Sequence, residues 1–459
     1  MLLKFFDLKE KDLLLIGHIF FWLLIIISYF TYQERLFADS SLYIFDIINY
    51  EKLKIFYSRY SSASTFIPSL ISVKLGLSYK TILIIYSITQ IFYYYLIYII
   101  IAYVIKKPNH AFALVLIFCV SINLTFFWPV SELSKGMAAC LILSALLDKY
   151  ESPDYSLRFF FLLILVLVFV FYFHILTIIM IMSTLIFHIL RMRRANWKIY
   201  FLICLPIILY LIKIMNLEFY EKNHMIAQWY FLKQDFIEKL YNYFISKYYI
   251  LIFFTLLSSI YFIIRKEILI LTYLLSAFIF YILFVNIYFE GYWNHFYTEN
   301  LYIPLGFLMI GIFFPKLYKS LNPNNRVYLN ILIFISIIIF FVRLNSAYSY
   351  YNTRVEELKN LIHKTSFKNY DKIVIQPDFT FREADGWSTS IETLVLSRLD
   401  NISKTFISKY NFDKFISNYK VDEHTLILCP WRATKDTQLN KKYFNFPTQK
   451  YGEGWNKRF

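Results

Sequence analysis

Long apolar runs recur along this chain between Leu13 and Val342, and they restrict its fold more than any other feature. Several contain about 17 residues or more, which lets an α-helix cross ~30 Å of hydrocarbon. The chain of 459 residues is 59% hydrophobic and only 17% charged, which is more apolar than a soluble core of that size needs. Alternating segments of ~10 residues, the pattern of a membrane β-barrel, do not occur. We therefore predict an all-α polytopic membrane protein.

Basic residues recur in the short segments between these runs. Because such residues mark cytoplasmic loops, the net charge of +16 indicates orientation and predicts no nucleic-acid partner. The markers are Lys4, Lys9, Lys11, Lys106, Lys107, Arg191, Arg193, Arg194, Lys198, Arg265, Lys266, Lys316, Lys319 and Arg326. Threading the apolar runs between them predicts about eleven spans in a bacterial inner membrane, with the N-terminus cytoplasmic and the C-terminus extracytoplasmic. The predicted spans are 12–31, 80–105, 110–128, 132–147, 157–173, 175–190, 199–215, 248–264, 267–288, 300–315 and 327–343.

The apolar run over 157–190 can be divided in two ways. It is too long for one span and just long enough for two short spans with a tight turn near His174. A single tilted span would invert everything downstream and place the basic residues that follow Leu190 outside the cytoplasm, against the positive-inside rule. We therefore predict two spans here.

The predicted topology places the larger loops outside, so binding or chemistry is expected on that face. These loops are 32–79, 216–247 and 289–299. The predicted transmembrane domain covers 1–345 and includes the first of them. Residues 346–459 carry many charges and no span, and they predict an extracytoplasmic α/β domain attached by a helical linker, NTRVEELKNLIHK. Within it, YDKIVIQPD and EHTLILCPW indicate short strands, and SIETLVLSRL and FDKFISNYK indicate amphipathic helices.

The stretch RLFADSSLYIFDII follows the first span and carries the most informative polar residues. On a helix, Asp39, Tyr43 and Asp46 share one face because they occupy positions i, i+4 and i+7. We expect such a helix to lie half buried along the membrane interface, with its polar stripe facing a wet cavity. A carboxylate at that depth costs several kcal/mol unless it is paired or solvated. Asp39 is therefore a catalytic candidate, with helix capping as the alternative, and Asp46 contacts substrate or has a structural role.

Three further charged residues belong to the predicted external side. Arg59 is either an interface anchor or a cation that binds phosphate. Glu132 and Lys135 lie three residues apart at the external mouth of the predicted span 132–147. They either form a simple i,i+3 ion pair or contact substrate.

Two more candidate positions lie further along the chain. His174 occupies the predicted turn between short spans, where it is either a satisfied buried imidazole or a phosphate contact. The loop FEGYWNHFYTEN contributes Trp293 and His295, which suit a sugar-binding rim because aromatic faces stack on sugar rings. Aromatic residues also collect at membrane interfaces for other reasons, so this loop is open to both interpretations.

An acid soon after the first span in ADSSLY, an amphipathic loop helix, many short spans and an external C-terminal domain resemble the membrane glycosyltransferases of the GT-C type. Those enzymes take sugars from polyprenyl-phosphate carriers on the outer side of the membrane. The resemblance implies that Asp39 is the catalytic base or a metal-associated carboxylate, which leaves a divalent metal ion open as a cofactor. The stretches WPVSELSKGMAACLILSALLDKY and FYFHILTIIMIM also resemble O-antigen and exopolysaccharide polymerases, although Lys135 stands where an Arg is expected.

Elementary chemistry agrees with the first resemblance. Glycosyl transfer needs a carboxylate to accept the acceptor's proton and positive groups to stabilise the departing phosphate. We therefore expect a glycosyltransferase that moves a sugar from a polyprenyl-phosphate donor to a cell-envelope glycan or lipid acceptor. The alternatives are a polysaccharide polymerase, a lipid-linked sugar transporter or flippase, and a non-catalytic scaffold. Only 9 glycines and a one-sided set of carboxylates count against a transporter.

Overall fold

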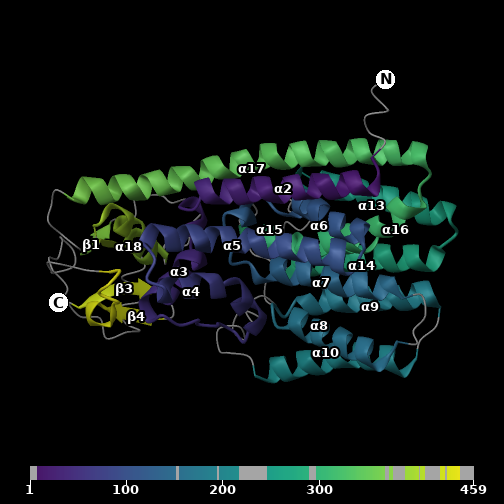
Figure 1. The fold of residues 1–459 in the computed structure, drawn as a ribbon, viewed down its shortest axis with the longest axis horizontal. Coiled ribbons are helices and arrows are strands. Elements are labelled where there is room, and N and C mark those ends of the chain that lie inside the picture. The colour runs from purple at the N-terminus through teal and green to yellow at the C-terminus, as the bar shows by residue number, and fades with distance from the viewer. Residues whose placement is uncertain are drawn as a thin grey trace.

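The computed structural model describes residues 8–150, 155–193, 196–216, 246–288, 296–366, 372–375, 388–402, 404–408, 424–429 and 432–444. Long helices lie side by side in a bundle, and a small group of strands with one helix covers one end of it (Figure 1). The bundle helices are α2 (Glu10–Phe30), α5 (Tyr79–Ile99) with its π-helical extension η3 (Ile100–Val104), α6 (Pro108–Ser121), α7 (Glu132–Lys149), α8 (Leu157–Phe171), α9 (Thr177–Met192), α10 (Trp197–Met215), α13 (Ser246–Ile264), α14 (Ile268–Tyr288), α15 (Phe296–Gly306) with π-helical η6 (Phe307–Ile312), α16 (Phe314–Ser320) and α17 (Pro323–Ser366).

Short helical segments connect these helices at the end that carries the strands. Between α2 and α5 lie η1 (Glu34–Leu36), α3 (Asp39–Tyr50), η2 (Tyr60–Thr65) and α4 (Ile67–Lys74), and η4 (Leu124–Phe126) lies between α6 and α7. The first external loop of the prediction is therefore largely helical.

Membrane-length helices are confirmed, whereas the full set of eleven spans stays a prediction. Five helices in the described part of the chain are long and apolar enough to cross a membrane: Glu10–Phe30, Tyr79–Val104, Trp197–Met215, Glu299–Ser320 and Pro323–Lys364. Five shorter apolar helices of 10–17 residues accompany them. The division of 157–190 into two helices is also confirmed, because α8 ends at Phe171 and α9 begins at Thr177.

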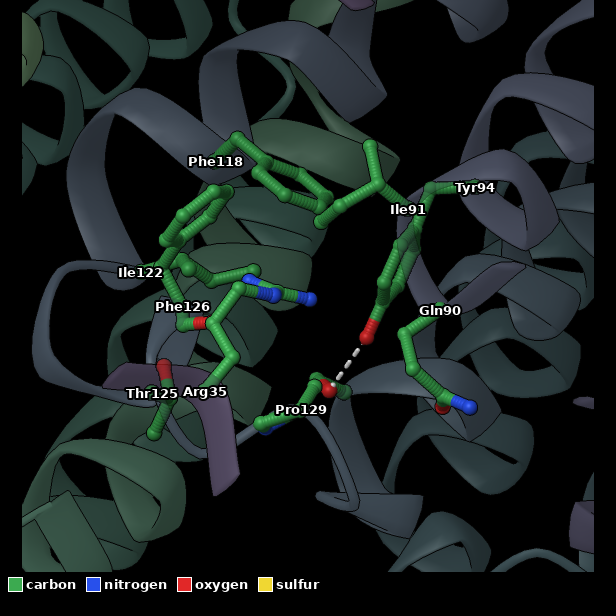
Figure 2. A pocket seen from close by; sticks show the side chains of 10 residues that line it. Arg35, Gln90, Ile91, Tyr94, Phe118, Ile122, Thr125, Phe126 and Pro129 are labelled. Carbon is green, nitrogen blue, oxygen red and sulfur yellow. Dashed lines mark hydrogen bonds between the residues drawn. The ribbon is translucent and has the colours of Figure 1, made fainter. Parts of the chain in front are cut away.

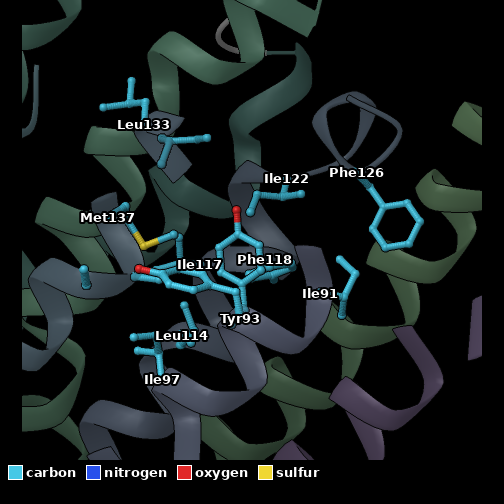
Figure 3. Packing of buried hydrophobic residues seen from close by; sticks show 14 of the residues in the cluster. Ile91, Tyr93, Ile97, Leu114, Ile117, Phe118, Ile122, Phe126, Leu133 and Met137 are labelled. Carbon is cyan, nitrogen blue, oxygen red and sulfur yellow. The ribbon is translucent and has the colours of Figure 1, made fainter. Parts of the chain in front are cut away.

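The core of the bundle is centred on α6. All of its residues from Asn109 to Ser121 are buried, as expected for a helix that is apolar on every side. Figure 3 shows its Leu114, Ile117 and Phe118 packed among side chains of α5 and α7. This close packing fixes the ends of α5 and α7. Glu132 and Lys135 of the candidate site, described below, lie in the first turn of α7.

Among the described residues, the basic residues of the predicted cytoplasmic loops belong to helix ends and connections that lie at the end of the bundle away from the strands (Figure 1). There the Asp148 carboxylate accepts hydrogen bonds from Lys107, at 2.6 Å, and from Arg191. Lys316 pairs with Glu267 at the same end. One end of the bundle thus holds the sequence's positive markers, as the predicted threading requires. The side of the membrane that this end faces stays a prediction.

The described residues of the C-terminal part form two small sheets next to helix α18 (Thr389–Ser397). Strands β1 (Lys372–Ile375) and β2 (Thr405–Ser408) pair in parallel and are connected through α18 and η8 (Arg398–Asp400). Strands β3 (Thr425–Cys429) and β4 (Arg432–Lys435) pair antiparallel, and η10 (Asp436–Gln438) follows. The two predicted strands and the helix in SIETLVLSRL are confirmed, whereas the helix predicted in FDKFISNYK lies outside the described residues.

Helix α17 joins the last predicted span to the predicted linker without interruption. It runs for 44 residues, from Pro323 to Ser366. Its second half is amphipathic and buries Tyr351, Val355 and Leu358. The predicted domain boundary near residue 345 therefore falls inside a continuous helix, and a division into two domains stays a prediction.

The prediction that the first-loop helix lies half buried along the membrane interface is wrong. Every residue of α3 from Ser40 to Asn49 is buried inside the protein. The polar face is covered from within the bundle, because Tyr43 bonds to Glu132 and stacks on Phe66. The C-terminal part covers another face: α18 packs on α3, and Phe45 contacts Phe444 with ring centroids 5.2 Å apart. The amphipathic pattern is present, but the surface that completes it comes from far along the chain.

Candidate functional site

Glu132 is the centre of a polar cluster at the end of the bundle that carries the strands. It is the first residue of α7 and is 4% exposed. Its Oε1 accepts a hydrogen bond of 3.0 Å from the Tyr43 hydroxyl, and its Oε2 accepts one of 3.0 Å from Nη1 of Arg59. Tyr43 on α3, Arg59 before η2 and Glu132 on α7 were predicted separately. In the structure, Tyr43 and Arg59 both bond to the Glu132 carboxylate.

Tyr43 acts as a donor in this cluster. Burial and the nearby Glu132 charge raise the pKa of the Tyr43 hydroxyl well above its ordinary value. The hydroxyl therefore stays protonated and donates to the carboxylate. The ring stacks on Phe66, with centroids 4.9 Å apart, which fixes its direction.

Lys135 lies one turn after Glu132 and is fully buried. Its Nζ donates to the Thr65 hydroxyl at 3.1 Å and lies 5.0 Å from the centroid of the Phe66 ring. The simple ion pair between Glu132 and Lys135 is not formed, because Glu132 pairs with Arg59 instead. Among the described residues, no carboxylate forms an ion pair with Lys135, although the Glu132 charge acts on it.

Arg35 is a second fully buried cation in the same region. Its Nε donates to Ser87 Oγ at 2.9 Å, and its guanidinium carbon lies 4.3 Å from the centroid of the Phe126 ring. Burial lowers the pKa of the Arg35 guanidinium to about 9, so the group remains charged at neutral pH. Within the described ranges no carboxylate pairs with it. The sequence places this Arg next to the first span but does not indicate burial.

A small cavity opens beside Arg35 (Figure 2). The volume that the centre of a water molecule can occupy in it is about 10 Å³, which is roughly enough for one water molecule. Figure 2 shows Tyr94 across the cavity from the Arg35 side chain; the Tyr94 hydroxyl lies 2.5 Å from Ser134 Oγ. Arg35 also lies close enough to Lys135 to interact with it electrostatically. The cavity is therefore lined by both polar and apolar side chains, with Arg35 as its charged residue.

Asp39 is the first residue of α3 and is half buried, one helical turn before Tyr43. Its charge acts on the Tyr43 hydroxyl, which places it beside the Glu132 cluster. The N-cap position itself is occupied by Ala38, and Asp39 lies in the first turn of the helix. Ala38 has φ of 49° and ψ of −118°, a conformation that non-glycine residues rarely adopt. Its N–H donates to Oε1 of Glu392, at 2.9 Å.

The remaining predicted residues are less closely tied to the cluster. Asp46 is on α3 but is 1% exposed, away from any surface. His174 lies in the turn between α8 and α9, where its Nδ1 accepts a hydrogen bond of 3.1 Å from the Leu176 N–H. It is near enough to Arg59 to interact electrostatically. Trp293 and His295 lie outside the described residues.

Comparisons with known proteins found no matching family model, no matching curated protein and no matching solved structure. Among the described residues, no group of three or more His, Cys, Asp or Glu side chains is arranged to hold a metal ion. Both carboxylate oxygens of Glu132 already accept hydrogen bonds, one from Tyr43 and the other from Arg59. We therefore derive no step through a metal ion. The cluster combines one half-buried carboxylate, one paired carboxylate and two buried cations without carboxylate partners.

Proposed function

We propose that this protein is a membrane glycosyltransferase. It would take a sugar from a polyprenyl-phosphate donor and transfer it to a cell-envelope glycan or lipid acceptor on the extracytoplasmic side. The observation that carries the proposal is the gathering of Arg35, Arg59 and Lys135 around Glu132, with Asp39 one turn from Tyr43. A buried cation without an anionic partner is costly, and a phosphate group supplies that partner.

The chemistry assigns a different task to each carboxylate. Asp39 takes the proton from the acceptor hydroxyl, whose oxygen then attacks the anomeric carbon of the donor sugar. The bond between that carbon and the phosphate oxygen breaks, and the phosphate leaves with the electron pair. Lys135 and Arg35 stabilise the negative charge on the leaving group. Glu132 is a positioning residue, because its two oxygens hold Tyr43 and Arg59.

The donor class follows from the surroundings of the cluster. Apolar helices of the bundle flank the site, so an isoprenoid tail can remain in the lipid while its phosphate approaches the cations. The described part of the C-terminal region contains two two-stranded sheets, and the chain carries neither a GxxxxGK[ST] nor a GxGxxG motif. A lipid-linked donor therefore suits this protein better than a nucleotide sugar does.

The test replaces Asp39 by Asn. Because Asn cannot accept the proton, we expect Asp39→Asn to lower transfer from a polyprenyl-phosphate-linked sugar by about 10²- to 10⁴-fold. The measurement is the rate of labelled sugar transfer by purified protein in lipid nanodiscs. Asp400→Asn, at an exposed carboxylate outside the cluster, is the matched control and should transfer at the native rate.

Two outcomes would contradict the proposal. Native transfer by Asp39→Asn would remove Asp39 from the reaction. Movement of a lipid-linked sugar across sealed vesicles without cleavage of any glycosidic or phosphate ester bond would indicate a transporter instead. Products that grow by repeated addition of one unit would assign the same chemistry to a polymerase.

A further inference from the structure

The C-terminal part of the chain holds the beginning of α3 through one buried ion pair. Arg354, on α17, donates to both oxygens of Glu392, on α18, at 2.9 Å each. The same carboxylate accepts the Ala38 N–H at 2.9 Å and the Ser388 hydroxyl at 2.6 Å. The side chains of Arg354 and Glu392 are only 6% and 4% exposed. Glu392 is therefore fixed by two elements and presents an oxygen to the residue before Asp39.

A second contact holds the other end of α3. The Asn49 side chain donates to the Gln438 carbonyl at 3.0 Å and accepts the Asn440 N–H at 2.8 Å. The Asn440 side chain also donates to the carbonyl of Ile48 at 3.2 Å. Both ends of the helix are thus bonded to segments that lie more than 300 residues further along the chain.

The hydrogen bond at Ala38 does more than join two distant segments, because the backbone of Ala38 has a strained conformation. A non-glycine residue at φ of 49° persists only when its surroundings impose that conformation. The hydrogen bond from the Ala38 N–H to Glu392 holds the peptide unit from which this strained residue continues, and the bidentate pair with Arg354 prevents Glu392 from moving away. The next residue is Asp39, so a rotation at Ala38 would carry its carboxylate to a new place.

We propose that the Arg354–Glu392 pair is a positioning device: it holds Ala38 in its strained conformation and thereby sets the location of the Asp39 carboxylate. The part of this inference that concerns sugar transfer rests on the proposed function. The part that concerns the backbone of residues 38–42 does not. The C-terminal part is then required for the reaction without touching the substrate.

The test separates the ion pair from the acceptor that it presents. Glu392→Gln keeps a side-chain oxygen for the Ala38 N–H and weakens the pair. The reversed pair, Arg354→Glu with Glu392→Arg, restores opposite charges but leaves no acceptor at position 392. We expect Glu392→Gln to unfold at a lower temperature yet keep most of its transfer rate. The reversed pair should approach native thermal stability and lose transfer by about 10- to 100-fold, in kcat rather than in KM.

Hydrogen–deuterium exchange of residues 38–42 supplies a readout that needs no activity. We expect exchange at these amides to accelerate in the reversed pair and to stay near the native rate in Glu392→Gln. If native protein transfers no sugar, the proposed function fails, and the exchange result still decides whether the pair holds the backbone. Unchanged exchange in the reversed pair, or native transfer by it, would overturn the inference.

A second comparison keeps the test decisive if the reversed pair does not fold. Glu392→Met fills a similar space without an acceptor, whereas Glu392→Gln retains one. Transfer and slow exchange at 38–42 should be kept in the Gln variant and lost in the Met variant. Equal behaviour of the two variants would mean that the carboxylate oxygen on Ala38 has no positioning role.

Discussion

The neighbouring residues Glu34 and Arg35 show two outcomes of burying a charge. Arg35 is fully buried and donates hydrogen bonds to the Ser87 hydroxyl and to backbone carbonyls. Glu34 is 8% exposed, and its Oε2 has no hydrogen-bond partner among the described residues. Burial raises the pKa of the Glu34 carboxyl above its ordinary value. The cation thus has neutral hydrogen-bond acceptors, whereas one oxygen of the carboxylate has no hydrogen-bond partner among the described residues.

Glu34→Gln should therefore stabilise the protein at neutral pH. Because the folded pKa of Glu34 is above the unfolded one, the native protein is most stable when this carboxyl is protonated. It loses stability as the pH rises through the folded pKa. The Gln variant lacks this loss, so its unfolding temperature should exceed the native value at pH 7 and converge with it under acid conditions. Thermal unfolding in detergent from pH 4 to pH 8 measures this, with Glu357→Gln at an exposed position as the control.

Between elements, one carboxylate links three helices at the basic end of the bundle. The Asp148 carboxylate, near the end of α7, forms ion pairs with Lys107, in the segment before α6, and with Arg191, on α9. The Asp148 and Arg191 side chains are 31% and 22% exposed, so water screens the pair only in part. Close packing supports the other end of the same helices: a Cβ at Gly136 would lie 2.5 Å from Thr177 Cγ2. Helix α7 is thus tied to α9 on both sides of its midpoint.

Asp148→Asn should lower the free energy of unfolding by about 1–3 kcal/mol, since two charge-assisted hydrogen bonds lose their acceptor charge. The measurement is thermal or denaturant unfolding in detergent. The matched control is Glu356→Gln, which breaks an exposed i,i+3 pair with Lys359 and should cost less than about 0.5 kcal/mol. An equal loss in both variants would show that Asp148 contributes no more than a surface pair.

Across the whole molecule, the two ends of the bundle have different characters. The basic residues of the short connections gather at one end, and the polar cluster and the C-terminal part gather at the other (Figure 1). By the positive-inside rule, we expect the basic end to face the cytoplasm. The Glu132 cluster would then face the extracytoplasmic side, where lipid-linked sugars meet their acceptors.

Reporter fusions test this orientation. Alkaline phosphatase is active only outside the cytoplasm, so a fusion after Phe459 should be active and fusions after Arg193 and Ser320 should be silent. A fluorescent protein that folds only in the cytoplasm should give the opposite pattern at the same positions. A silent phosphatase after Phe459 would place the C-terminal part inside the cell and exclude an extracytoplasmic reaction.

Much of the candidate site could be anticipated from local patterns. Tyr43, Arg59, Glu132 and Lys135 were chosen for charge, depth and position relative to the apolar runs, and the structure brings them together. Their pairing could not be anticipated, because Glu132 bonds to Arg59, 73 residues away, rather than to Lys135, three residues away. Helical spacing predicts only contacts within an element.

The sequence by itself determined the apolar helices, the break near His174, two of the C-terminal strands and the helical nature of residues 39–50. These features depend on hydrophobic periodicity and local backbone preference, which are properties of neighbouring residues. Only the tertiary structure decided that α3 is buried, that Arg35 is buried beside a cavity, and that Glu392 accepts a hydrogen bond from Ala38. Each of these depends on surfaces supplied from distant parts of the chain, since burial and pairing are set by what packs on a helix rather than by its own pattern.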